Sequence, residues 1–267
     1  MTMELARLGL NLVLVGRDSG KLRDVSDAIA RSHAVRTKTV VFDLSLVGSA
    51  EGDEAMRRLR EAVEGLDVGV LVNNAAVAKP GALYLHEADV EPLMRMVRVN
   101  LQALTEVTAA VLPGMVQRGR GAVVNIGSGS TLAIPSFPLY SVYAATKRYV
   151  AVFSRSLYVE YKSRGIDVQC QVPFLIETNM VSSAVRSLFV PAFVVNPAAC
   201  ARAAVSWIGH GPLCVPNFAH QLQWWLAGYA PETLLDAYRL SLHLQQRAIF
   251  RMLKEWRRGP GKFGLQS

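Results

Sequence analysis

A tyrosine and a lysine four residues apart, Tyr143 and Lys147, form the sequence pattern with the clearest chemical meaning. They fall near the start of a helical apolar pattern at 142–161, where a spacing of four places both side chains on one face. Tyrosine has a pKa of about 10, and a nearby ammonium group lowers that pKa by favouring the phenolate. We predict a proton-transfer pair that protonates a carbonyl as the carbonyl accepts hydride.

Other small polar residues occur at the ends of predicted strands. Ser128 and Ser130 follow the apolar run at 122–126, and Asn73 follows the run at 68–72. Ligands bind at the carboxyl edge of open α/β sheets, where such residues gather. Asn100 interrupts the apolar face of the predicted helix at 90–116. Each asparagine also has a structural explanation, since Asn73 could cap a strand and Asn100 could bond a backbone carbonyl.

Apolar, β-branched runs alternate with helical patterns along the chain. Strands are predicted at 11–15, 39–42, 68–72, 122–126 and 168–172, with a weaker one at 213–215. Helices are predicted at 22–29, 55–63, 90–116 and 142–161. This alternation is typical of βαβ units, so we predict an α/β fold with a Rossmann-like, doubly wound parallel sheet.

Composition is that of a globular protein. The 267 residues are 51% hydrophobic and 19% charged, and the net charge is +8. No aromatic-basic motif predicts nucleic-acid binding. The three cysteines have no metal-ligand or disulfide spacing, and no apolar run is long enough to predict a transmembrane segment. Much of the positive charge lies near the C-terminus, where we interpret it as a solvated helix face: Arg247, Arg251, Lys254, Arg257, Arg258 and Lys262.

The pattern changes after about residue 220. Residues 1–220 are predicted to form an N-terminally truncated Rossmann-type domain, and residues 221–267 a helical extension with a basic tail. Pro231 suits the first turn of a helix in this extension. Trp224 and Trp225 are interpreted as core or partner packing, with a substrate wall or a membrane anchor as the alternatives.

The motifs together resemble those of the short-chain dehydrogenase/reductase family. Asn73-Asn74-Ala75, Asn100, the run 125–128 and the Tyr143/Lys147 pair occur in family order, over residues 1 to about 220. Longer runs at 65–74, 138–144 and 165–173 more closely resemble plant very-long-chain 3-oxoacyl-CoA reductases. These are the β-ketoacyl reductases of the fatty acid elongase, and they are related to 17β-hydroxysteroid dehydrogenases.

The resemblance implies roles for the site residues. Tyr143 would be the general acid, Lys147 would lower its pKa and hold the nicotinamide ribose, and Asn100 would hold a proton-relay water. A serine would orient the substrate carbonyl. Ser130 has the family's usual interval to the tyrosine, but Ser128 is favoured because the end of the strand fixes its position.

The resemblance also implies an NADPH site. Arg17 follows the strand at 11–15, where the family meets the adenosine ribose, and arginine suits a 2′-phosphate. Asp43 would contact the adenine. The remaining cofactor contacts implied by the resemblance are Asn73, Ala75, Tyr143, Lys147 and Thr178. No metal is expected.

By resemblance, the expected reaction is NADPH-dependent reduction of 3-oxoacyl-CoA to 3-hydroxyacyl-CoA in very-long-chain fatty acid elongation. It would take place at the cytosolic face of the endoplasmic reticulum, with other elongase subunits as candidate partners. A homodimer through 90–116 and 142–161 and a peripheral membrane contact are compatible with it. The alternatives are a 17β-hydroxysteroid dehydrogenase-type ketone reductase and a catalytically impaired, truncated relative with an interaction role.

One family feature is missing. The glycine-rich fingerprint that lets the backbone approach the cofactor pyrophosphate does not occur, and neither does the first strand. The chain therefore reads as beginning within the family's first helix, as a fragment or mis-started gene model would, unless another segment takes the strand's place. Loss of this central strand would expose two apolar strand edges. We expect the 267-residue chain alone to aggregate and to bind NADPH weakly, and tight stoichiometric binding by the purified chain would contradict this expectation.

Overall fold

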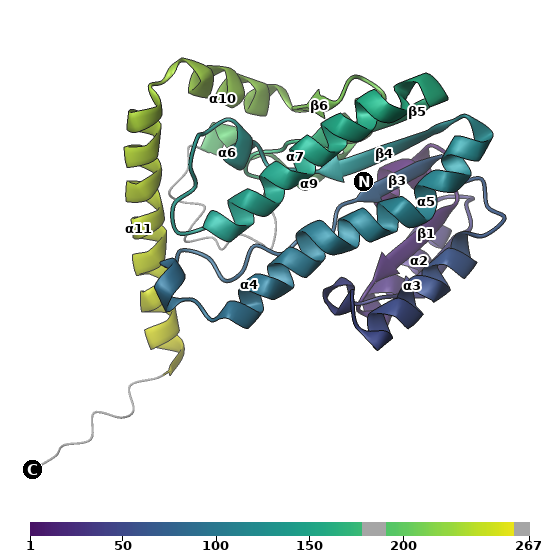
Figure 1. The fold of residues 1–267 in the computed structure, drawn as a ribbon, viewed down its shortest axis with the longest axis horizontal. Coiled ribbons are helices and arrows are strands. Elements are labelled where there is room, and N and C mark those ends of the chain that lie inside the picture. Colours follow the sequence, from purple (N-terminus) through teal and green to yellow (C-terminus); the bar gives the residue numbers. More distant parts are fainter. Residues whose placement is uncertain (178–190, 259–267) are drawn as a thin grey trace, which may run out of the picture.

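The strands of the molecule are all parallel and alternate with helices (Figure 1). The computed structural model describes residues 1–177 and 191–258. Each predicted strand is present, with ends shifted by no more than two residues. The α/β fold class is confirmed. The strands are β1 (Leu12–Gly16), β2 (Thr37–Val41), β3 (Val70–Asn73), β4 (Gly121–Ile126), β5 (Ile166–Gln171) and β6 (Leu213–Cys214).

Several helices begin or end at capping residues. The Asp18 side chain accepts a hydrogen bond from the Lys21 amide at the start of α2, and α5 ends at Gly119 with φ of 66°. The helices are α1 (Thr2–Arg7), α2 (Ser19–Ser32), α3 (Ala50–Val63), α4 (Val90–Val97), α5 (Leu104–Arg118), α6 (Gly129–Leu132), α7 (Ser141–Tyr161), α9 (Pro197–Ser206), α10 (Phe218–Tyr229) and α11 (Glu232–Arg258). Single turns are η1 (Leu44–Leu46), η2 (Leu85–Glu87), η4 (Lys162–Arg164) and η5 (Pro191–Phe193).

The long helix predicted at 90–116 is interrupted. A π-helical turn, η3 (Arg98–Ala103), joins α4 to α5. This combined helix, 90–118, is long and apolar enough to cross a membrane by length and composition alone. However, Leu112 and Met115 of α5 are buried in the core. A core helix passes the same test, so the helix is weak evidence for a membrane span.

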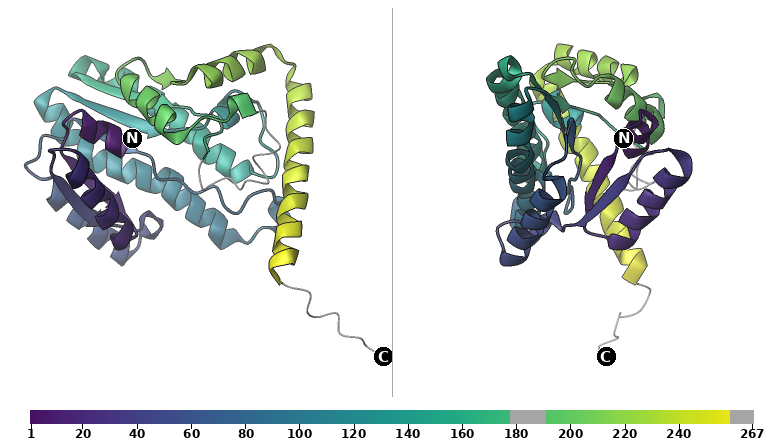
Figure 2. Two further views of the ribbon diagram at one scale, coloured as in Figure 1. Left: turned by 180° about the vertical axis from the view of Figure 1, so that it is seen from behind. Right: turned by 90° about the vertical axis from the view of Figure 1, so that its right-hand side faces the viewer.

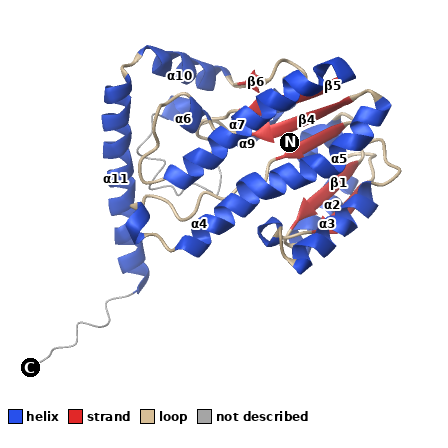
Figure 3. Cartoon of the chain, in the orientation of Figure 1, coloured by secondary structure: helices blue, strands red, loops and turns tan. Residues whose placement is uncertain are grey.

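The sheet is divided into two parts (Figure 3). One part is the pair β1-β2, and the other has the order β3-β4-β5-β6. Among the residues that the structure describes, no strand pairs with the free edge of β1 or with the free edge of β3. In the two-stranded part, Val15 of β1 and Val41 of β2 remain 38% and 46% exposed, which is unusual for β-branched residues in a parallel sheet. The division agrees with the missing central strand inferred from the sequence.

Helices cover both faces of the sheet. In Figure 2, α3, α4, α5 and α7 form one layer, while α1, α2 and α9 lie on the other side. The four-stranded part has a core in which Met115, Val123, Ile166 and Val168 are completely buried. The helix α11 stands across the end of the molecule toward which β4 points (Figure 1). It therefore lies beside the carboxyl edge where the candidate site is expected.

Candidate active site

The candidate proton donor, Tyr143, lies in the first turn of α7 and is half-buried. Desolvation raises its pKa above the usual value for tyrosine, and a hydrogen bond with Ser128 acts in the opposite direction. The loop after β4 brings the Ser128 hydroxyl to this position. Of the two candidate serines, Ser128 is therefore the one in contact with the tyrosine.

One turn further along α7, Lys147 is 4% exposed. Its Nζ donates a hydrogen bond to the carbonyl of Ile126 at the end of β4, at 2.7 Å. Burial lowers the pKa of Lys147 to about 8. Desolvation is the largest influence on the pKa of Tyr143, and the Lys147 ammonium bonds the end of the strand. The expected lowering of the Tyr143 pKa by Lys147 stays a prediction.

Asn100 lies in the π-helical turn and is 1% exposed. Its Oδ1 accepts from the Val77 amide at 2.7 Å, and its Nδ2 donates to the Val77 carbonyl at 2.8 Å. The same Nδ2 also donates to Thr146 Oγ1 at 3.1 Å. These bonds connect the segment after β3 to the helix turn that carries Lys147. Asn100 thus bonds a backbone carbonyl, which was one of the explanations offered from the sequence. Its bonds hold the segment after β3 against α7. π-helical turns often occur at functional sites.

Asn73 ends β3, and its amide points into a polar network rather than into solvent. Its Nδ2 donates to Asn125 Oδ1 at 2.8 Å and to Thr108 Oγ1 at 2.9 Å. Asn125 in turn donates to Ser154 Oγ at 2.9 Å. The network joins β3, β4, α5 and α7 behind the site. The sequence analysis did not identify Thr108 and Ser154, and it included Asn125 only as part of the run 125–128. Their signal was a polar residue within an otherwise apolar stretch.

The residues expected at the adenosine end lie on the two-stranded part of the sheet. Arg17 follows β1 and is exposed, and Asp43 follows β2. Burial tends to raise the pKa of Asp43, but two hydrogen bonds from Ser45 and the charges of Arg95 and Arg17 together lower it. Arg17 and Asp43 are therefore close enough to interact electrostatically.

Two further residues, Ala75 and Thr178, were expected to contact the cofactor. Ala75 is exposed in the loop after β3. Thr178 lies outside the described residues.

The helix α11 holds the loop that leads into α7, which the sequence analysis missed. His243 Nδ1 donates to the Pro138 carbonyl at 2.6 Å, and Tyr140 Oη donates to Gln246 Oε1 at 2.9 Å. His243 must carry its proton on Nδ1, because a carbonyl can only accept. The available signal was a set of polar residues at helical spacing on one face of the predicted helix.

One residue of the basic tail was misinterpreted. Arg247 is 8% exposed and forms an ion pair with Glu87 of η2, so it is not part of a solvated helix face. The tertiary contact between α11 and the loop after β3 causes this difference. Arg251 on the same helix is exposed and lies 3.8 Å from Glu87.

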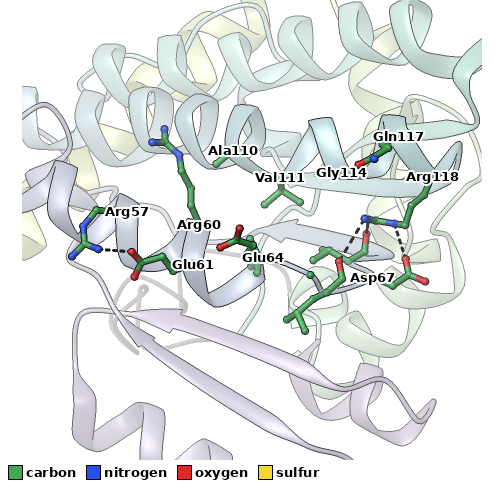
Figure 4. A pocket seen from close by; sticks show the side chains of 14 residues that line it. Arg57, Arg60, Glu61, Glu64, Asp67, Ala110, Val111, Gly114, Gln117 and Arg118 are labelled. Atoms are coloured by element: carbon green, nitrogen blue, oxygen red, sulfur yellow. Dashed lines mark hydrogen bonds and ion pairs between the residues drawn. The ribbon is translucent and has the colours of Figure 1, made fainter.

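A cavity of about 850 Å³ lies away from these residues, between α3 and α5 at the amino end of β3 (Figure 4). Its apolar lining includes Val63 and Ala110, which pack with the core beside β2, and Val68 and Val111, which pack with the core of the four-stranded part. The cavity therefore marks the seam between the two parts of the sheet. None of the predicted site residues lines it.

Comparison with known proteins agrees with this geometry. The chain belongs to the short-chain dehydrogenase family, whose model matches residues 1–188. This family consists of oxidoreductases that use nicotinamide cofactors, so the expected enzyme class and cofactor class are confirmed.

Individual relatives differ in activity. The chain is 46% identical to a very-long-chain 3-oxoacyl-CoA reductase-like protein of Arabidopsis thaliana, over 92% of this chain and 77% of that protein. It is 36% identical to the human inactive hydroxysteroid dehydrogenase-like protein 1, over 86% and 68%. A short-chain dehydrogenase from Sphingobium yanoikuyae, solved in complex with NADPH, has a TM-score of 0.71 and 28% identity over 90% of this chain and 88% of that chain.

Proposed function

We propose that this protein reduces 3-oxoacyl-CoA to 3-hydroxyacyl-CoA with NADPH, in very-long-chain fatty acid elongation at the cytosolic face of the endoplasmic reticulum. The observation that carries the proposal is the contact between Ser128 and Tyr143 beside a buried Lys147. The similarity to the Arabidopsis reductase-like protein supports the substrate class and the pathway.

Three side chains of this site do the proton chemistry. The Tyr143 hydroxyl donates a proton to the substrate oxygen, and its raised pKa keeps it protonated at neutral pH. Ser128 donates a hydrogen bond to the same oxygen and orients the carbonyl. The Lys147 ammonium, which is charged below a pH of about 8, stabilises the negative charge that develops on that oxygen.

NADPH, when bound, supplies the hydride. The described residues provide contacts for the two ends of NADPH but not for its centre. Within the described residues, Ile126 is the hydrogen-bond partner found for Lys147 Nζ, so this ammonium group has donors available for a ribose hydroxyl. The exposed Arg17 suits a 2′-phosphate. Between them, the described part of the chain contains no glycine-rich turn that could cradle the pyrophosphate. We therefore expect this protein to hold NADPH chiefly by its two ends.

A substrate comparison tests the proposal. Purified protein with saturating NADPH is assayed for NADPH oxidation with a 3-oxoacyl-CoA and, separately, with a 17-ketosteroid. Faster turnover of the 3-oxoacyl-CoA is the expected result. Turnover of the steroid alone would assign the protein to the hydroxysteroid dehydrogenases.

A second candidate, a relative without catalytic activity, is favoured by one observation. The divided sheet lacks a partner for the facing edges of β1 and β3 among the described residues, at the place where this fold binds the cofactor phosphates. The human relative named as inactive shows that the family contains such proteins. Failure to oxidise NADPH with either ketone would support this candidate.

A further inference from the structure

Arg239 of α11 carries a buried charge without a counter-ion. Its side chain is 8% exposed, and within residues 1–177 and 191–258 it forms no ion pair. Its Nε is buried without a hydrogen-bond partner. Burying an unpaired charge is costly, and desolvation lowers the pKa of this guanidinium. A position of this kind is expected to gain a partner when a ligand binds.

Nearby carboxylates do not supply that partner. Asp236, one turn earlier on α11, accepts a hydrogen bond from Ser136. Glu87 is paired with Arg247. Neither carboxylate forms an ion pair with Arg239, so its guanidinium has no direct acidic partner among the described residues.

The position of Arg239 relates it to the candidate active site. Its Cζ lies 5.5 Å from the centre of the Phe137 ring, and this ring lies 6.3 Å from the ring of Tyr143. The distance from the Arg239 Cζ to the centre of the Tyr143 ring therefore cannot exceed the sum of these two distances. Arg239 shares the inward face of α11 with His243, which holds the loop between Phe137 and Tyr143.

The tip of the side chain can be reached from solvent. Of the three guanidinium nitrogens, Nε is fully buried. The two Nη atoms also lack hydrogen bonds among the described residues, but they are not fully enclosed. A planar guanidinium with an accessible edge binds carboxylate and phosphate groups through paired hydrogen bonds.

We propose that Arg239 binds an anionic group of the ketone substrate, a phosphate or a carboxylate, while the ketone lies against Tyr143. This inference rests on the proposed function for the ketone, but binding of the anion is a separate property. A phosphate would come from a coenzyme A carrier, and a carboxylate from a free 3-oxo acid. Arg239 is a binding residue in this proposal and takes no part in proton transfer.

The test compares three substrates at saturating NADPH: a 3-oxoacyl-CoA, the corresponding free 3-oxo acid, and the neutral N-acetylcysteamine thioester of the same acyl group. Arg239→Gln is expected to raise KM for one or both anionic substrates about 10- to 100-fold, and to leave KM for the neutral thioester unchanged. Arg239→Lys should restore part of the loss. An effect on the coenzyme A thioester identifies a phosphate, and an effect on the free acid identifies a carboxylate.

A matched control removes an exposed charge from the same helix. Arg251→Gln should leave all three KM values unchanged, because Arg251 is exposed and its guanidinium lies beside Glu87. Thermal unfolding of Arg239→Gln should show only a small loss of stability, since the guanidinium has no ion pair and the substitution removes its contacts with the Phe137 and Tyr238 rings. An equal rise in KM for the neutral thioester, or unchanged KM for both anionic substrates, would overturn the proposal.

Direct binding separates this inference from the proposed function. Calorimetric titration of coenzyme A and of a short fatty acid, without NADPH, should show at least one ligand that binds the wild-type protein and is weakened by Arg239→Gln. If no ketone is reduced but this difference is observed, the proposed function fails and the anion site remains. If the ketones are reduced but neither ligand is weakened by the substitution, the anion site fails and the proposed function remains.

Discussion

The four-stranded and two-stranded parts of the sheet differ in how completely they are cross-linked. In the four-stranded part, Asn73, Asn125 and Ser154 join neighbouring strands and a helix through buried hydrogen bonds. In the two-stranded part, the comparable side-chain contact is the partly buried pair of Ser26 and Thr37, at 2.5 Å. The proton-transfer residues lie on the first part and the expected adenosine contacts on the second.

This difference shows why one half of the site is formed and the other is open. Parallel strands need partners on both sides to satisfy their backbone groups. Strand β4 has partners on both sides, and it positions Lys147 through the carbonyl of Ile126. Strand β1 has a partner on one side among the described residues, and Arg17 beyond it is exposed. Substitutions in the four-stranded part are therefore expected to change kcat strongly, whereas substitutions in the two-stranded part should change the Kd for NADPH only slightly.

The largest effect should come from the four-stranded part. Tyr143→Phe removes the hydroxyl that donates the proton, so kcat should fall by roughly 10²- to 10⁴-fold. Binding of NADPH, measured by fluorescence titration, should change little, since the hydroxyl acts on the substrate. Retained turnover would remove Tyr143 from the mechanism.

The pH dependence sharpens the assignment within this part. Burial lowers the pKa of Lys147 to about 8, so its charged form is lost as the pH rises through that value. The pKa of Tyr143 is raised, so its proton remains available there. We expect kcat/KM for ketone reduction to fall about tenfold per pH unit above pH 8.

Lys147→Arg provides the check on this profile. An arginine keeps its charge at alkaline pH, so an active variant should lose the decline above pH 8. If the decline persists unchanged in the active variant, or if the wild-type profile stays flat to pH 10, the decline does not report on Lys147.

Stability should also separate the two parts. Asn125→Ala leaves Asn73 and Ser154 without their buried partner, and should lower the free energy of unfolding by about 1–3 kcal/mol. The matched substitution Ser26→Ala in the two-stranded part should cost about 0.5–1.5 kcal/mol. Urea denaturation of both variants measures the difference, and equal losses would contradict the comparison.

The smallest effect is expected at the adenosine end. Arg17→Ala removes an exposed charge, which is typically worth about 0.2–1 kcal/mol, so Kd for NADPH should rise by about fivefold or less. Binding of NADH should be unchanged because NADH has no 2′-phosphate. A similar loss of NADH affinity would show that Arg17 acts on the fold of the loop and not on the phosphate.

Periodicity predicted the strands and helices well because their apolar patterns are long and regular. It did not predict the π-helical turn at Arg98–Ala103, because a single wide turn within a long apolar helix has no distinct local pattern. Periodicity also predicted that Arg247 is exposed to solvent, because a charged residue on an amphipathic helix is normally assigned to the exposed face unless a partner is known. That partner, Glu87, is 160 residues away in the sequence.

The sequence by itself determined the order of the elements, the Tyr143/Lys147 pair and the absence of a glycine-rich turn between Met1 and β1, because each is a local pattern or spacing. The tertiary structure decided that Ser128 hydrogen-bonds Tyr143, that Lys147 bonds the end of β4, and that Arg239 is buried without a counter-ion beside the site. These outcomes depend on which distant segments pack together, and burial then changes the pKa values and the cost of each charge.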